Sequence, residues 1–266
     1  MNKVRLFRVP EPMEYEALSA WLSRLALSQG TAPSAVAKLL DLDFRRNDVD
    51  RSVTGERLQN VRRICGLARS AFAVSERVMM SLSRLHRGGE EYLIKHKGPG
   101  NARFRFCPCC LTEMPVPHFP IHWRFIAWRR CPDHDCLLED SCPHCDKPIL
   151  FPINIEQSTS GRAGYASLDR CHHCANLLTN TIPYWLNEGD RRLVTPGDDG
   201  MLHNGRALLA ALVNRSFQIQ GRNGSLDLRG LAKIRRWQLF PVDSDWLSPK
   251  ALRTQPPQTP MTHESA

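Results

Sequence analysis

Seven cysteines and one histidine fall into four close pairs in the middle of the chain, in a pattern typical of zinc ligands. Two residues separate the members of each pair, so one turn of backbone can present two ligands to one ion. A structural zinc ion takes four such ligands in a tetrahedron. The spacing therefore predicts two structural Zn²⁺ ions. The expected ligands are Cys107, Cys110, Cys131 and His134 for one ion, and Cys142, Cys145, Cys171 and Cys174 for the other.

The spacing between the pairs leaves two topologies open. There are 20 residues between Cys110 and Cys131, 25 between Cys145 and Cys171, and only 7 between His134 and Cys142. Neighbouring pairs that share an ion give consecutive zinc ribbons, whereas alternating pairs give a cross-brace of the RING type. We favour consecutive ribbons. Either arrangement closes each site with four protein ligands, so metal catalysis is not expected.

The other cysteines and nearby histidines are expected to have no part in metal binding. Cys65 and Cys136 are interpreted as small buried apolar residues, and Cys109 is expected to point away from the metal. His118 and His122 are four residues apart, but their distance from the cysteine pairs does not match a zinc finger. We interpret both as packing residues.

Composition indicates a folded protein that carries excess positive charge in its first part. The chain has 266 residues, of which 42% are hydrophobic, and a net charge of +9. Residues 1 to 110 carry 19 basic and 11 acidic residues, against 17 and 16 in the remainder. A basic half favours a polyanionic partner, DNA or RNA above all. Neither an apolar signal segment nor a membrane-spanning run is present, so we expect a cytoplasmic protein with reduced cysteines.

Apolar spacing predicts a mainly α-helical fold with small zinc-ribbon β elements. We expect helices over residues 14–29, ending before Gly30, from Thr31 as N-cap, and from Thr54 as N-cap to a stop at Gly66. Ser75 and Glu76 resemble the start of another helix, and two more are expected around residues 208–213 and 231–236. The predicted domains are a helical module (1–100), tandem zinc ribbons (101–180), a C-terminal helical element (181–252) and a disordered tail (253–266).

The helices expected within residues 54–84 have the outline of a helix-turn-helix module. Six arginines on or near these helices are candidates for nucleic-acid contact: Arg57, Arg62, Arg63, Arg69, Arg77 and Arg84. The acidic residues Asp41, Asp43, Asp48 and Asp50 are instead interpreted as a solvated, helix-capping run. No metalloprotease helix, phosphate-binding loop or nucleophile elbow is found, so we do not expect an enzyme.

Several segments together resemble the TniQ/TnsD family of transposon proteins, which select insertion sites. The run from Tyr15 to Ala26 (YEALSAWLSRLA) is similar to the opening motif of that family. The resemblance continues through FCPCCL (106–111), His122-Trp123, Trp128, CPDH (131–134), Leu138 and CPHC (142–145). It covers residues 10 to 180.

The resemblance implies a non-enzymatic adaptor that connects target recognition to the AAA+ ATPase that recruits the transposase. Some members bind a DNA site themselves, whereas others join an RNA-guided CRISPR effector complex, often as homodimers. The chain is short for the DNA-reading branch, which favours the compact TniQ branch. Two other functions stay open: a zinc-containing DNA-binding transcription regulator, and a RING-like interaction module.

Overall fold

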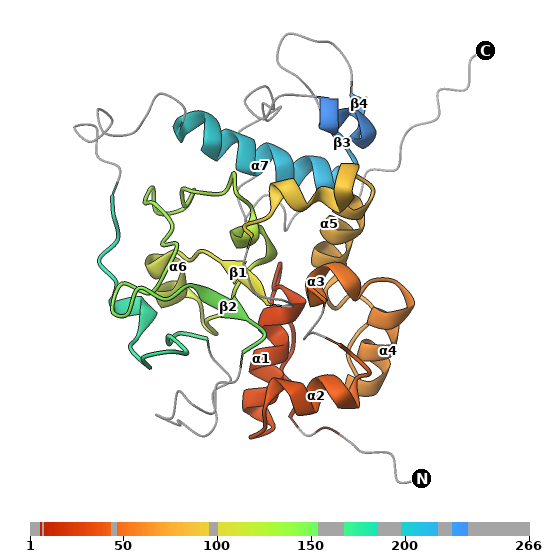
Figure 1. The fold of residues 1–266 in the computed structure, drawn as a ribbon, viewed down its shortest axis with the longest axis vertical. Helices are drawn as coiled ribbons and strands as arrows, with labels where there is room; N and C mark the ends of the chain where they lie inside the picture. Colours follow the sequence, from red (N-terminus) through yellow and green to blue (C-terminus); the bar gives the residue numbers. More distant parts are fainter. Residues whose placement is uncertain are drawn as a thin grey trace.

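The computed structural model describes residues 6, 8–43, 47–95, 101–153, 168–185, 198–217 and 225–233. Helices dominate both ends of the described chain, and its strands form two small antiparallel pairs (Figure 1). The first helices are α1 (Leu18–Ser28), α2 (Pro33–Leu39), α3 (Val49–Ser52), α4 (Glu56–Cys65), α5 (Ala73–Ser83) and the 3-10 helix η1 (His86–Tyr92). The predicted fold class, mainly helical with small β elements, is confirmed.

The middle and last elements alternate short helices and strands. They are β1 (Ala102–Phe104), α6 (Pro108–Glu113), η2 (Ile121–Arg124), β2 (Ile149–Phe151), η3 (Leu178–Asn180), α7 (Asp198–Asn214), β3 (Ser216–Phe217), β4 (Leu226–Asp227) and η5 (Leu228–Lys233). Strands β1 and β2 pair with Ala102 opposite Phe151, and β3 pairs with β4. In the part of the chain that the structure describes, no helix is long and apolar enough to cross a membrane.

Helix α1 begins at Leu18, four residues later than the sequence predicts, because the preceding backbone pairs elsewhere. The amide of Ala17 donates to the carbonyl of Phe119 over 3.0 Å, and the amide of Ile121 donates to the carbonyl of Tyr15 over 2.7 Å. Residues 15–17 therefore extend along residues 119–121 instead of starting a helix. This pairing joins the start of α1 to the region that contains the cysteine pairs.

Two expected helix caps are wrong by one residue. The N-caps of α2 and α4 are Ala32 and Gly55, not Thr31 and Thr54, and neither has a side-chain cap. The amide of Gly55 instead donates to the Glu76 carboxylate over 2.9 Å. The predicted stop at Gly66 is confirmed, since this residue adopts the left-handed conformation (φ 70°) that favours glycine.

Helix α5 begins at Ala73, and the polar residues that were expected to start it make tertiary contacts instead. The Ser75 hydroxyl donates to the carbonyl of Glu16 over 2.7 Å, and Glu76 pairs with Arg62 over 2.8 Å. The first contact joins α5 to the residues just before α1, and the second joins α5 to α4.

Helix α7 lies against α5, as Figure 1 shows. The Ser81 hydroxyl of α5 donates to the carbonyl of Leu212 over 2.7 Å. The helix predicted around residues 208–213 is confirmed and is longer than expected. The other helix, predicted around residues 231–236, lies partly outside the described chain, which ends at residue 233. Its described part belongs to the 3-10 helix η5. The expected disordered tail lies outside the described chain too.

A buried ion-pair network joins α1, α3 and η2. The Arg124 guanidinium, 2% exposed, donates to Asp50 over 2.6 Å and also pairs with Asp48. Asp50 accepts two further hydrogen bonds, from the Ser19 amide (2.7 Å) and hydroxyl (2.8 Å). Asp48 does cap α3, as expected of a helix-capping run, but the prediction of a solvated Asp50 is wrong.

The main apolar core includes residues from both sides of the segment at 88–100. Met79 and Leu82 of α5 belong to the same buried cluster as the aromatic rings around β1 and β2. The rings of Phe119 and Phe151 lie 4.7 Å apart, for example. Trp123 and Trp128 are buried in this core.

Candidate metal centres and arginine surface

The four residues of each expected ligand set lie together in the structure. Within each set, the potential ligand atoms all lie within 4.8 Å of one another. The sets combine pairs that are neighbours in the sequence, which is the arrangement of consecutive ribbons and not of a cross-brace. Each cluster has the soft donors and the size to hold one metal ion.

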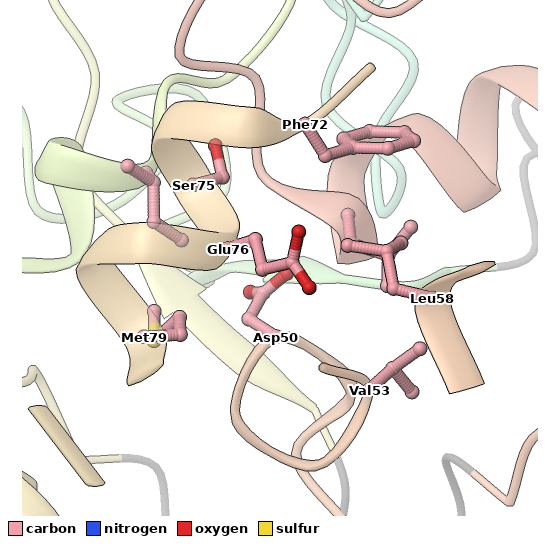
Figure 2. Close-up of a pocket in the computed structure, with 9 residues that line it drawn as sticks. Asp50, Val53, Leu58, Phe72, Ser75, Glu76 and Met79 are labelled. Atoms are coloured by element: carbon pink, nitrogen blue, oxygen red, sulfur yellow. The ribbon is translucent and has the colours of Figure 1, made fainter. Parts of the chain in front are cut away.

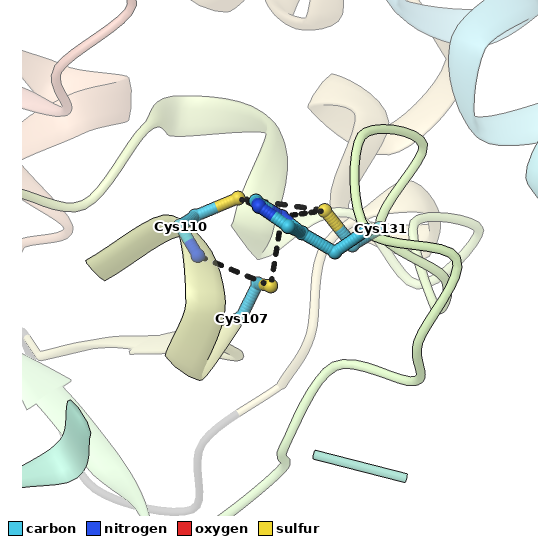
Figure 3. Close-up of side chains that lie close together, drawn as sticks. Cys107, Cys110 and Cys131 are labelled. Carbon is cyan, nitrogen blue, oxygen red and sulfur yellow. Dashed lines mark hydrogen bonds between the residues drawn. The ribbon is translucent and has the colours of Figure 1, made fainter. Parts of the chain in front are cut away.

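In the first cluster the ligand atoms point toward one another (Figure 3). The Cys110 sulfur is 3.4 Å from that of Cys131 and 3.3 Å from Nδ1 of His134. The Cys107 sulfur lies 3.6 Å from the same Nδ1. Sulfurs bound to one tetrahedral zinc ion are about 3.8 Å apart, from Zn–S bonds of about 2.3 Å. The cluster is thus close to the size that zinc requires.

A helix terminus builds one side of this first cluster. Cys107 is the N-cap of α6, with Pro108 in the first turn, and its sulfur accepts a hydrogen bond from the Cys110 amide (3.4 Å). Such amide donors stabilise a thiolate and orient it toward a metal. At the other end of α6, Glu113 accepts a hydrogen bond from Nε2 of His134 over 2.9 Å.

The contact with Glu113 fixes the orientation of the His134 ring. With Nε2 held by the carboxylate, Nδ1 is left to face the sulfurs, as in a carboxylate–histidine–metal arrangement. Burial of the ring lowers the pKa of His134, but the hydrogen bond to Glu113 and the Cys131 sulfur outweigh this and raise the pKa to about 9. Glu113 was not predicted from the sequence, although its place three residues after Cys110 on one helix is a usable signal.

The other three turns share one backbone geometry. In each, the amide of the first cysteine donates to the carbonyl five residues later: Cys131 to Cys136, Cys142 to Lys147, and Cys171 to Asn176. The residue four positions after that cysteine has a positive φ in all three. This repeated hairpin-like turn places residues i and i+3 side by side, which explains why the pairs share one spacing.

The second cluster is made by two such turns. The sulfurs of Cys142 and Cys174 lie 3.7 Å apart, as do those of Cys145 and Cys171. The His173 amide donates to the Cys171 sulfur over 3.4 Å. His173 therefore supports the cluster through its backbone.

Two cysteines that were expected to play no part lie beside the first cluster. Cys136 is fully buried, as predicted, but its sulfur is only 3.6 Å from that of Cys107. Cys109 lies outside the first ligand set, and its sulfur lies within 4.8 Å of those of Cys107 and Cys136. The turn at 131–136 places Cys136 beside Cys107. Neither cysteine belongs to the first ligand set, but the expectation that they play no part beside it is incomplete.

Cys65, by contrast, is a buried thiol in the α1–α4 core, where burial raises its pKa to about 12. His118 and His122 are partly buried packing residues, as expected. The His122 ring lies 4.3 Å from that of Trp128, and Nδ1 of His118 is 2.9 Å from the Val116 carbonyl oxygen.

Five of the six candidate arginines are exposed, on or beside α4 and α5. They are Arg57, Arg63, Arg69, Arg77 and Arg84. Arg62 differs, because its guanidinium is used inside the protein: it donates to the carbonyl of Ala71 (2.6 and 2.9 Å) and pairs with Glu76. The connection between α4 and α5, residues 66–72, is longer than the three or four residues of a common helix-turn-helix turn.

A small cavity lies beside the same helices. It measures ≈ 10 Å³ and is lined by side chains that include Asp50, Ser75, Glu76 and Met79 (Figure 2). A space of about 10–15 Å³ holds roughly one water molecule, whereas small-molecule pockets span about 300–1,000 Å³. Most of the lining side chains are apolar, and the space is far too small for a small molecule, so this cavity is not a substrate site.

The family model named TniQ matches residues 7–138. The matched stretch contains α1 to α5 and the complete first cluster, and it ends before the second. No curated protein matches the chain. Because residues 7–138 form a TniQ domain, the chain belongs to the TniQ family.

Proposed function

We propose that this protein is a non-enzymatic adaptor in transposition. In this proposal it connects a target-recognition partner to an AAA+ ATPase, which then recruits the transposase. The target partner is either an RNA-guided CRISPR effector complex or the target DNA itself, and the adaptor works as a monomer or homodimer. The TniQ match over residues 7–138 carries the proposal.

Each cluster holds one structural zinc ion in this proposal. The ligands are Cys107, Cys110, Cys131 and His134 for the first ion and Cys142, Cys145, Cys171 and Cys174 for the second. Thiolates and imidazole favour zinc, and the sulfur separations of 3.4 to 3.7 Å fit its tetrahedron. Four protein ligands leave no position for a reacting water molecule. The ions would therefore hold the turns rigid for binding and would carry out no reaction.

The exposed arginines of α4 and α5 are the proposed nucleic-acid surface. Arg77 lies on α5 and Arg84 is the C-cap of the same helix; they are seven residues apart and so share one side of the helix. Guanidinium groups on one exposed face suit contact with the phosphates of DNA or RNA. We exclude Arg62 from the surface because its charge is already paired with Glu76.

Charge reversal tests this surface. The double variant Arg77→Glu with Arg84→Glu should weaken binding to DNA, or to an RNA-containing complex, and should flatten its salt dependence. Reversal of two exposed arginines near the other end of the described chain, Arg215 and Arg229, is the matched control. Equal losses from both double variants would show that binding follows net charge alone.

A second candidate function rests on the same arginines. A zinc-containing transcription regulator would read duplex DNA directly through α4 and α5. The isolated protein would then bind one DNA sequence at least about a thousandfold more tightly than random DNA. An adaptor that relies on a separate recognition complex would show no such preference.

The experiment that tests the adaptor maps insertions in cells that carry the complete transposition system. Deletion of this protein should abolish insertion at the target site while the transposase remains present. Retention of site-directed insertion at the normal frequency would refute the proposal. Reintroduction of the wild-type protein is the control for indirect effects.

A further inference from the structure

Three thiols form a cluster that neither proposed zinc site accounts for. The sulfurs of Cys107, Cys109 and Cys136 all lie within 4.8 Å of one another, and those of Cys107 and Cys136 are 3.6 Å apart. Only Cys107 belongs to the first ligand set. The first centre thus has five cysteines around it, whereas one tetrahedral ion with a histidine ligand can use three.

The 3.6 Å between the sulfurs of Cys107 and Cys136 is that of sulfurs that share a metal ion, and the Cys109 sulfur lies within 4.8 Å of both. With Zn–S bonds of about 2.3 Å, the sulfurs are about 3.8 Å apart on a tetrahedral ion and about 4.0 Å apart in a trigonal plane. A thiol that only fills space has no reason to sit in such a group, as Cys65 illustrates. Cys65 is buried among the side chains of the α1–α4 core and belongs to no such cluster among the described residues.

We propose that Cys107, Cys109 and Cys136 hold a third, thiophilic metal ion, Zn²⁺ or Cu⁺, and that the Cys107 thiolate bridges it to the ion of the first cluster. This inference rests on the proposed metal site at that cluster. A thiolate sulfur has three lone pairs, so Cys107 can bind two ions and still accept the hydrogen bond from the Cys110 amide (3.4 Å). Soft thiolate donors select Zn²⁺ and Cu⁺ over harder ions.

The charges balance for a divalent ion. Binding takes the protons from the thiols of Cys109 and Cys136 and releases them to solvent, so two negative charges offset the two positive charges of Zn²⁺. The bridged pair therefore has the same net charge as the single-ion site. Cu⁺ would sit in the same three sulfurs as a trigonal ion and leave the pair one unit more negative.

The position of Cys109 gives the third ion a route to solvent. Cys107 and Cys136 are fully buried, whereas Cys109 on α6 is partly exposed. An ion can therefore enter from the side of Cys109. A zinc ion there would have three protein ligands and a fourth position open to water.

Metal counting on the full-length protein tests the proposal. The protein is purified under reducing, oxygen-free conditions, supplied with zinc, freed of loosely bound ions on a chelating resin, and analysed for zinc and copper. We expect three ions per chain, either three zinc or two zinc and one copper. Cys109→Ser and Cys136→Ser should each reduce the count to two, and Cys65→Ser should leave it at three. Cys109 is the safer position, because a partly exposed thiol can be replaced without a large effect on packing.

The possible counts separate this inference from the zinc proposal. Two ions in the wild type and in the Cys109 and Cys136 variants would overturn the third site but leave the two proposed zinc sites intact. One ion or none in the wild type would overturn both proposals. A fall to one ion in Cys136→Ser would assign Cys136 to the ordinary first site and also overturn the bridge. With cadmium in place of zinc, coupling between two cadmium resonances through the Cys107 sulfur should appear, and its absence would contradict the bridging thiolate.

Discussion

Replacement of Arg124 by methionine should destabilise the fold strongly, because it would leave a carboxylate buried without its countercharge. Arg124 is 2% exposed and pairs with Asp50, which is 1% exposed at its side chain. Loss of one partner from such a buried pair costs about 3–5 kcal/mol. The two hydrogen bonds from Ser19 remain but bring no positive charge. Since domains are stable by only about 5–15 kcal/mol, this is a large fraction of the total.

The ion pair between Arg51 and Glu90 provides a matched control. Its side chains are 30% and 56% exposed, and the two charged groups lie 2.8 Å apart. Solvent screens such a pair, which is worth about 0–1 kcal/mol. Arg51→Met removes the same charge and leaves the same new side chain. We therefore expect Arg51→Met to lower the free energy of unfolding at least about three times less than Arg124→Met does.

Urea denaturation of zinc-loaded protein, followed by circular dichroism, measures both changes. A double variant, Arg124→Met with Asp50→Asn, should recover part of the loss, because the uncompensated charge is then gone. The neutral amide can still accept from Ser19. A free energy of unfolding for Arg124→Met within about 1 kcal/mol of the wild type would show that Asp50 does not depend on the Arg124 charge. So would a double variant that is less stable than Arg124→Met alone.

Further predictions concern metal and pH. Cys142→Ser should lose one zinc ion and become protease-sensitive, whereas Cys65→Ser should keep full metal content, as elemental analysis and limited proteolysis would show. A strong chelator should likewise lower the melting temperature of the wild type, and zinc should restore it; an unchanged melting curve would contradict a structural metal. Burial lowers the pKa of His122 to about 3 and that of His118 to about 4. The unfolded chain binds these protons from about pH 6.5 downward, so stability should fall below that pH, by up to about 1.4 kcal/mol per ring at pH 5.5. Glutamine at both positions should flatten this fall, and an unchanged pH profile would contradict it.

Local features of the fold and the candidate site were predictable from the sequence. The ligand pairs form because residues i and i+3 of one turn meet, which depends on the turn alone. The stop at Gly66 likewise reflects a single residue in a left-handed conformation. Helix α7 was found from its apolar spacing, although its length was not.

Features that depend on distant partners could not be predicted. The sequence suggests that Asp50 is solvated, because its ion-pair partner Arg124 lies 74 positions away. The start of α1 shifted because Tyr15 and its neighbours pair with residues 119–121. The sequence suggests that Cys136 is a small apolar residue, because its neighbour Cys107 lies 29 positions earlier in the chain. In each case the chain alone shows the residue type but not its neighbour.

The most direct test of the adaptor is a reconstituted assembly on target DNA. The target-recognition complex, the AAA+ ATPase and this protein are mixed with labelled DNA, and the ATPase retained at the target site is measured with and without this protein. We expect the ATPase to be retained at the site only when all components are present, and we expect no DNA cleavage or joining by this protein alone. Equal retention of the ATPase without this protein, or nuclease or transposase activity in the isolated protein, would contradict the proposed adaptor function.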